Sequence, residues 1–161
     1  MAAARTRPPT ADDAGNDNLD IEAQLCFALY SATLALGKTY APILAGLGLT
    51  YPQYLAMLVL WHEDGLTVRA LGEQLHLESG TLTPMLKRME RAGLIHRIRD
   101  TQDERLVRIT LTQPGRDLRV RALHVPCAIA DIMGLSLERL AAIRDDLLAL
   151  RQAMETAVPK S

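Results

Sequence analysis

The chain has 161 residues, a formal net charge of −1 and 48% hydrophobic residues. Its length suits one domain with a sizeable core, or a domain with additional dimerisation helices, and its net charge excludes a polycation. Its longest apolar run, Tyr54 to Trp61, is too short to span a bilayer, and residues 1–18 lack the apolar region of a secretion signal, so we expect a cytoplasmic protein with no membrane partner. Two cysteines make no disulfide framework, and the four histidines are scattered without a Cys-x-x-Cys pair, so we expect no metal and no cofactor.

Residues 1–18 have the composition of a disordered tail. Residues 19–48 predict a long N-terminal helix, from Leu19 to about Leu44, that ends at a Gly-Leu-Gly segment. Its apolar residues recur at helical spacing: Leu25, Leu29, Ala32, Leu36, Tyr40 and Ile43. A capping box with proline in the first turn, residues 50–53, then predicts a helix that runs through Trp61.

Two short helices follow. Residues 67–75 have an amphipathic pattern, residues 76–80 form the turn, and residues 81–91 predict a second helix that ends at Gly93. We expect Pro84 in the first turn of that helix, with the N-cap among residues 79–81. Two helices joined in this way are a helix-turn-helix, in which the second helix reads DNA.

Two β-branched segments, residues 95–99 and 106–111, predict a hairpin joined by the polar residues 100–105. A hairpin directly after a recognition helix is the wing of a winged helix-turn-helix, so residues 49–113 are the expected DNA-binding region. Basic side chains that phosphate contact requires are Lys87, Arg88, Arg91, Arg97, Arg99, Arg105 and Arg108, and small hydroxyl residues at the helix start are Ser79, Thr81 and Thr83. The alternative is a charged surface on an ordinary α+β domain.

Residues 114–161 predict helices again, with a break near Pro126 and a cap at Ser136. The last helix has an apolar stripe: Leu137, Leu140, Ile143, Leu147, Leu150 and Met154. The terminal helices are more apolar than a compact winged helix needs, so we expect them to form a homodimer that reads a palindromic double-stranded operator. The expected fold is therefore mainly α with a small β-hairpin wing, a winged helix-turn-helix with N- and C-terminal dimerisation helices.

This arrangement resembles the MarR family of transcription regulators over nearly all of the chain after the tail. Residues 77–94 are similar to the family's recognition helix, and Asp103-Glu104-Arg105 followed by Leu111-Thr112 and Gly115 matches its wing signature, which adds Asp103 to the expected DNA-binding residues. The sequence Ser-Gly-Thr-Leu-Thr-Pro at residues 79–84 resembles that of the organic-hydroperoxide sensors of the family, the OhrR type.

The resemblance places a peroxide-reactive cysteine at Cys26. Since no basic residue flanks Cys26 in sequence or at helical spacing, hydrogen bonds must stabilise its thiolate. The resemblance supplies Tyr40 and Tyr51 as donors. Fourteen residues of continuous helix span about 21 Å, so Tyr40 would act on Cys26 of the other subunit. Alternatively, Cys26 is a small core residue, the tyrosines only pack, or Tyr30 and Tyr54 are the donors.

The second cysteine, Cys127, makes the chain resemble the two-cysteine form of these sensors, in which a sulfenic acid at Cys26 condenses with Cys127 of the opposite subunit. A buried, inert Cys127 is the alternative.

The resemblance implies a repressor, not an enzyme, that an organic hydroperoxide releases from its operator. One competing hypothesis is a regulator of this family that binds a phenolic or other small molecule without covalent chemistry. Another is a thiol peroxidase, which would have no need of the basic helix and wing.

Overall fold

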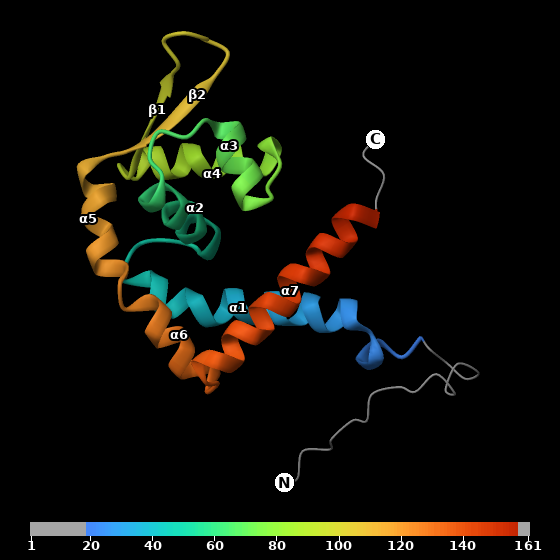
Figure 1. Cartoon of the computed structure of the whole chain (residues 1–161). Helices are drawn as coiled ribbons and strands as arrows, with labels where there is room; N and C mark the ends of the chain where they lie inside the picture. Colours follow the sequence, from blue (N-terminus) through green and yellow to red (C-terminus); the bar gives the residue numbers. More distant parts are fainter. Residues whose placement is uncertain (1–18, 158–161) are drawn as a thin grey trace. The chain divides into compact units, whose positions relative to one another are not determined.

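The structure is a computed structural model that describes residues 19–157, so the tail expected at residues 1–18 lies outside the described residues. The chain divides between Thr39 and Tyr40 into two units. The second unit contains a helix-turn-helix followed by a two-stranded antiparallel hairpin (Figure 1). The expected winged helix-turn-helix is therefore confirmed.

The first unit is helical and exposed. Asp20 caps a short 3-10 turn, Ile21–Ala23, by accepting a hydrogen bond from the Glu22 N–H at 3.0 Å. Helix α1, Leu25–Ala45, therefore begins six residues later than the sequence predicts. No described residue before position 40 is buried, although Leu25, Tyr30 and Leu34 are large and apolar.

The second unit begins with the last residues of α1. Gly48 has a φ of +67° in the corner after α1, as the Gly-Leu-Gly segment predicts. Helix α2, Tyr51–His62, has the expected capping box, in which the Thr50 N–H donates to the Gln53 side chain at 2.9 Å. Helix α3, Val68–Leu75, is capped by the Thr67 hydroxyl, which accepts from the Ala70 N–H at 3.1 Å.

The recognition helix α4, Ser79–Arg91, begins earlier than the sequence predicts. Its N-cap is Glu78, whose carbonyl accepts from the Thr81 and Leu82 N–H groups, so the cap is not among residues 79–81. Pro84 consequently lies in the second turn rather than the first. The missing proline N–H would have bonded to the Gly80 carbonyl, and Gly80 is exposed, so water can take its place.

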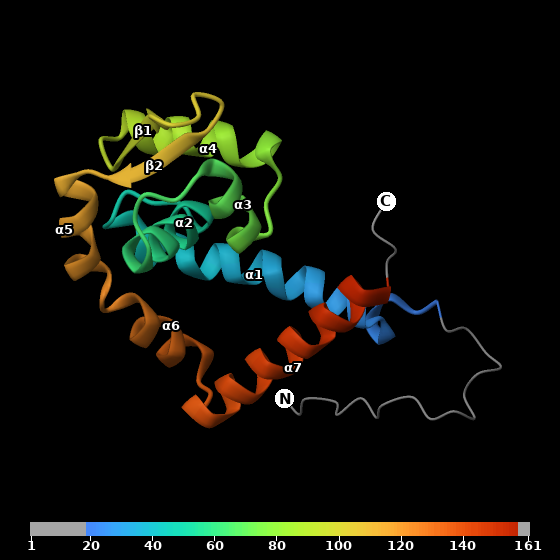
Figure 2. The ribbon, with the colours of Figure 1, turned by 45° about the horizontal axis from the view of Figure 1, so that its top comes forward.

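The hairpin is formed by β1, Ile95–Arg99, and β2, Val107–Leu111, in a register that pairs Ile95 with Leu111 and Arg99 with Val107. It lies beside α4 in both views of the ribbon (Figure 1, Figure 2). The wing and the recognition helix therefore form one continuous part of the second unit.

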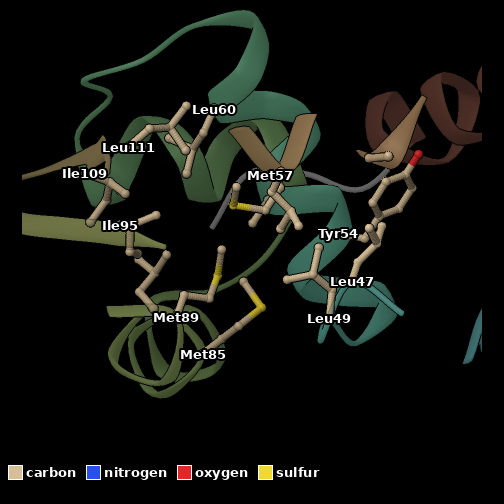
Figure 3. Close-up of a cluster of buried hydrophobic side chains, with 14 of the residues drawn as sticks. Leu47, Leu49, Tyr54, Met57, Leu60, Met85, Met89, Ile95, Ile109 and Leu111 are labelled. Atoms are coloured by element: carbon tan, nitrogen blue, oxygen red, sulfur yellow. The ribbon is translucent and has the colours of Figure 1, made fainter. Parts of the chain in front are cut away.

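A hydrophobic core joins the helices to the base of the wing (Figure 3). It includes Met57 and Leu60 of α2, Met85 and Met89 of α4, and Ile95, Ile109 and Leu111 of the hairpin, all 6% exposed or less. Burial of this apolar surface stabilises the arrangement in which the wing emerges next to α4.

Helix α5, Gln113–Ala122, begins in very close contact with the turn before β1. The Trp61 indole N–H donates to the Gly115 carbonyl at 2.8 Å, and the Thr112 N–H donates to the Leu94 carbonyl at 3.1 Å. A Cβ on Gly115 would lie 2.1 Å from the Leu94 carbonyl oxygen. Only glycine fits at this joint.

The chain ends in α6, Val125–Met133, and α7, Leu137–Ala157, which is preceded by the expected Ser136 cap. No residue of α7 is buried, and large apolar side chains on it are exposed, Leu137 at 73% and Met154 at 50%. In residues 19–157 no single helix could cross a membrane by length and composition. The helical segments Gln113–Met133 and Leu137–Ala157 are long and apolar enough to span a membrane only when they are taken together, and a bend of 95° separates them.

Candidate functional site

The recognition helix has two distinct faces. Leu82, Met85, Leu86 and Met89 point into the core. The opposite face carries most of the residues expected to bind DNA: Ser79, Thr81, Lys87, Arg88 and Arg91 are exposed, and Thr83 is half-buried. This face presents hydroxyls at its N-terminal end and cations at its C-terminal end, which suits contact with base edges and phosphates.

The wing adds exposed cations next to this face. Arg99 and Arg105 are exposed. A hollow of about 270 Å³ lies between the wing and the start of α4, and Ser79, Thr83 and Arg105 line it together. The structure thus brings three of the expected DNA-binding residues from α4 and the wing to one place.

Two arginines that were expected to contact phosphate have partners within the chain instead. Arg97 is only 20% exposed and pairs with Glu90 of α4 at 3.8 Å. Arg108 pairs with Asp100 and donates to the Gly65 carbonyl at 3.1 Å. Their guanidinium groups hold the wing in place.

The wing turn is ordered by two carboxylates. Asp100 accepts hydrogen bonds from the Gln102 N–H at 2.8 Å and the Asp103 N–H at 3.2 Å, in addition to the Arg108 contact. These bonds, first the one from Gln102, hold the pKa of Asp100 below its ordinary value. Asp103 accepts from the Arg105 N–H at 3.0 Å, so its carboxylate shapes the backbone that presents Arg105.

The outer edge of β2 is attached to the loop between α2 and α3. Ile109 exchanges backbone hydrogen bonds with Gly65 and Leu66, at 3.0 and 2.8 Å. The Leu111 N–H donates to Asp64 at 2.9 Å, and Asp64 also pairs with Arg116 of α5 at 2.6 Å. Asp64 was not among the predicted residues, and its position just before a glycine in a loop was the one local signal for it.

The two tyrosines expected at the thiol site are in contact. The rings of Tyr40 and Tyr51 have centroids 4.5 Å apart, and Tyr54 lies 6.0 Å from Tyr40. Burial raises the pKa of all three phenols above the ordinary value of about 10. Their hydroxyls therefore keep their protons at neutral pH and are available as hydrogen-bond donors.

Both cysteines are free and exposed in the single chain. Cys26 is the second residue of α1, in the first unit, and Cys127 follows Pro126 in the first turn of α6, in the second unit. The alternative of a cysteine buried in the core therefore does not hold for either residue within one chain. No group of metal-ligating side chains occurs in residues 19–157.

The residue before Cys127, Pro126, lines an apolar hollow of about 200 Å³. It is lined by Tyr54, Leu58, Trp61, His62, Arg119 and Pro126, among others. This hollow was not predicted, because its lining brings α2 together with α5 and α6, which lie far from α2 in sequence.

Comparison with known proteins gives consistent matches. Residues 49–107 match the sequence model of the MarR family. The organic hydroperoxide resistance transcriptional regulator of Bacillus subtilis (strain 168) is 49% identical over 140 residues, which cover 87% of this chain and 90% of that protein. The HTH-type transcriptional regulator TtmR of Methylorubrum extorquens (strain PA1) is 45% identical over 86% of this chain and 71% of its own.

A solved structure with a similar fold is overoxidized AbfR bound to DNA, with a TM-score of 0.71 and 34% identity over 86% of this chain and 95% of that one. AbfR, a protein of Staphylococcus epidermidis, has also been solved in a reduced form bound to DNA and in a disulfide form, with TM-scores of 0.70 and 0.57.

Proposed function

Since the chain belongs to the MarR family of transcription regulators, we propose that it is a repressor that binds a palindromic operator as a homodimer and releases it when an organic hydroperoxide oxidises Cys26. As a member of this family it is a transcriptional regulator and not an enzyme.

In the DNA complex, α4 of each subunit enters a major groove, and the wing contacts the flanking backbone or minor groove. Ser79, Thr81 and Thr83 lie toward the bases, and the cations of α4 and of the wing, Lys87, Arg88, Arg91, Arg99 and Arg105, bind phosphate. The amphipathic division of α4 and the hollow shared by α4 and the wing support these roles. Asp103 contributes by holding the Arg105 backbone.

The homodimer is supported by the apolar surface that one chain leaves exposed. Leu25 and Leu34 of α1 and Leu137 and Leu147 of α7 are each more than 40% exposed. An apolar stripe along a helix is stable in water only when another surface covers it, and a second copy of the same chain is the simplest cover.

The contact between Tyr40 and Tyr51 is the observation that carries the redox hypothesis. Two protonated phenols held together are suitable donors for a thiolate, and Cys26 has no cation nearby in sequence to stabilise its anion. Because α1 includes both Cys26 and Tyr40, fourteen residues apart, the donors come from the second subunit.

The chemistry takes two steps. The Cys26 thiolate attacks the outer oxygen of the hydroperoxide. An S–O bond forms, the O–O bond breaks, and the alkoxide leaves as an alcohol after taking a proton. The Cys127 thiolate then attacks the sulfenic sulfur of Cys26, and a disulfide forms as hydroxide leaves and is protonated to water. The existence of reduced, overoxidized and disulfide forms of AbfR supports this sequence of states.

A disulfide would release DNA by moving helices. It requires Cα atoms about 4.4–6.8 Å apart, and any wider separation in the reduced dimer must close when the bond forms. Because Cys127 lies in α6, between α5 and α7, such movement would change the spacing of the two recognition helices.

A second candidate is a regulator that binds a phenolic or other small molecule without covalent chemistry. The hollow lined by Trp61, Arg119 and Pro126 favours it, because it combines an aromatic wall with a cation. Treatment with an organic hydroperoxide, described next, separates this hypothesis from the redox hypothesis.

That experiment treats the reduced protein with cumene hydroperoxide and measures DNA binding and electrophoretic mobility without reductant. The unmodified protein should lose DNA and form a reducible band at twice the monomer mass, whereas Cys26→Ser should bind DNA and ignore the peroxide. Cys127→Ser is the matched control, which should still react at Cys26 but stop at the sulfenic acid or over-oxidise. If peroxide still released Cys26→Ser from DNA, Cys26 would not be the sensor.

A further inference from the structure

The outer edge of β1 is held by a residue of the recognition helix. Opposite Arg97 in the register is Ile109, which uses its own N–H and C=O on Leu66 and Gly65, so the Arg97 N–H points away from β2. Glu90 Oε1 accepts a hydrogen bond from this N–H at 3.1 Å. The carboxylate thus closes the edge of the wing against α4, which lies beside it (Figure 2).

The same carboxylate compensates the charge of Arg97. Glu90 Oε2 lies 3.8 Å from the Arg97 guanidinium, and the Arg97 Nε is buried without a hydrogen-bond partner among the described residues. A half-buried guanidinium with an unsatisfied nitrogen depends on the acidic neighbour that it has, here Glu90. Glu90 therefore holds both the backbone and the side chain of β1 at this point.

We propose that Glu90 is a positioning residue for DNA binding, which sets the distance between the wing and α4 without contacting DNA itself. The base-reading hydroxyls lie on α4 and Arg105 lies on the wing, so both can meet one DNA site only when the two elements keep a fixed spacing. This inference rests on the proposed DNA contact of Arg105. Glu90 lies in α4 and Arg97 lies seven residues later in β1, so the hydrogen bond between them joins the recognition helix to the wing.

Electrostatics alone predicts the opposite result of removing Glu90. DNA repels a carboxylate, so the loss of a negative charge near the binding face should tighten binding. The loss of a positioning contact should weaken it. The sign of the change therefore tests the proposal.

The experiment measures the affinity of the reduced protein for a labelled duplex selected by that protein from a random-sequence library. Glu90→Ala should bind about tenfold more weakly, the order expected when one phosphate contact is lost. Glu90→Gln keeps an oxygen acceptor for the Arg97 N–H and should bind between the two. The matched control is Glu104→Ala, which removes an exposed wing carboxylate with no bond among residues 19–157 and should bind equally or more tightly.

A double-mutant cycle with Arg105→Ala identifies the cause. If Glu90 acts by placing the wing, Glu90→Ala should add little to the loss already caused by Arg105→Ala. Circular dichroism and thermal unfolding of each variant check that the fold is kept, and Glu90→Gln decides the sign if Glu90→Ala does not fold. Tighter binding by the Glu90 variants, or full additivity with Arg105→Ala, would overturn the proposal. No effect of Arg105→Ala alone would instead reject the proposed wing contact.

Discussion

Replacement of Gly115 by alanine tests the joint between α5 and the wing. An added Cβ would lie 2.1 Å from the Leu94 carbonyl oxygen and 3.1 Å from the Leu94 carbonyl carbon. Both atoms belong to the backbone, so α5 must move by about 1 Å or more to reach ordinary contact distances. That movement also disturbs the hydrogen bonds from Trp61 to Gly115 and from Thr112 to Leu94.

The expected cost follows from three contributions. Overpacking costs about 1–3 kcal/mol, and a weakened hydrogen bond costs about 1 kcal/mol. Alanine returns up to about 1 kcal/mol, because it favours a helix over glycine. The net destabilisation should be about 1–4 kcal/mol, a large share of the roughly 5–15 kcal/mol of a typical domain at its upper end.

Urea unfolding followed by circular dichroism measures this change, at one protein concentration for all variants because the proposed association of subunits would contribute to stability. The control is Gly80→Ala in α4, where the added Cβ has nothing within 4 Å. Gly80→Ala should be neutral or stabilising by up to about 1 kcal/mol. A Gly115→Ala variant as stable as the unmodified chain would refute the close approach to Leu94.

Three further predictions concern function and pH. Arg105→Ala should weaken DNA binding by about 1–3 kcal/mol and reduce its dependence on salt, as fluorescence anisotropy across a salt series would show; unchanged affinity would remove the wing from the DNA contact. Tyr40→Phe and Tyr51→Phe should each slow oxidation of Cys26, because the loss of a hydrogen-bond donor raises the thiol pKa. The rate of thiol loss with cumene hydroperoxide measures this, and Tyr30→Phe is the control. Equal rates in the unmodified protein and all three variants would make the tyrosines packing residues only. Because the pKa of Asp100 is lowered in the folded state, its ionised form adds stability above its unfolded pKa of about 4, and this is lost as pH falls through the folded value. Asp100→Asn should therefore lower the unfolding midpoint at pH 7 and lose this difference in strong acid, and a difference that persists there would contradict the ionic role of Asp100.

Much of the fold could be predicted because its signals are local. The Thr50 capping box, the Gly93 stop and the β-branched residues of segment 95–99 are signals that depend only on neighbouring residues. The structure has the capping box, a positive φ at Gly93 and a strand at residues 95–99. The predicted start of α4 was wrong because proline is most common in the first turn of a helix. Here Pro84 lies in the second turn, and only the exposed Gly80 carbonyl loses its hydrogen-bond partner within the helix.

The partners of charged side chains could not be predicted in the same way, because they depend on elements that meet only in three dimensions. Arg97 was expected at phosphate, yet it pairs with Glu90. One signal for its burial was available, since Arg97 lies two residues from the buried Ile95 and therefore on the same face of β1. For Asp64, no periodicity indicated that its carboxylate would meet β2 and α5.

Trp61 is the one tryptophan of the chain, and its surroundings make it an intrinsic optical reporter. Its indole N–H is bound to the first turn of α5, its ring faces Tyr54 edge-on with centroids 6.4 Å apart, and it lines the apolar hollow beside Pro126. Emission from this single fluorophore should therefore respond to a molecule that enters the hollow and to any shift of α5 against α2. Stopped-flow fluorescence could then time the motion that we propose to follow oxidation, without a label and in the unmodified protein.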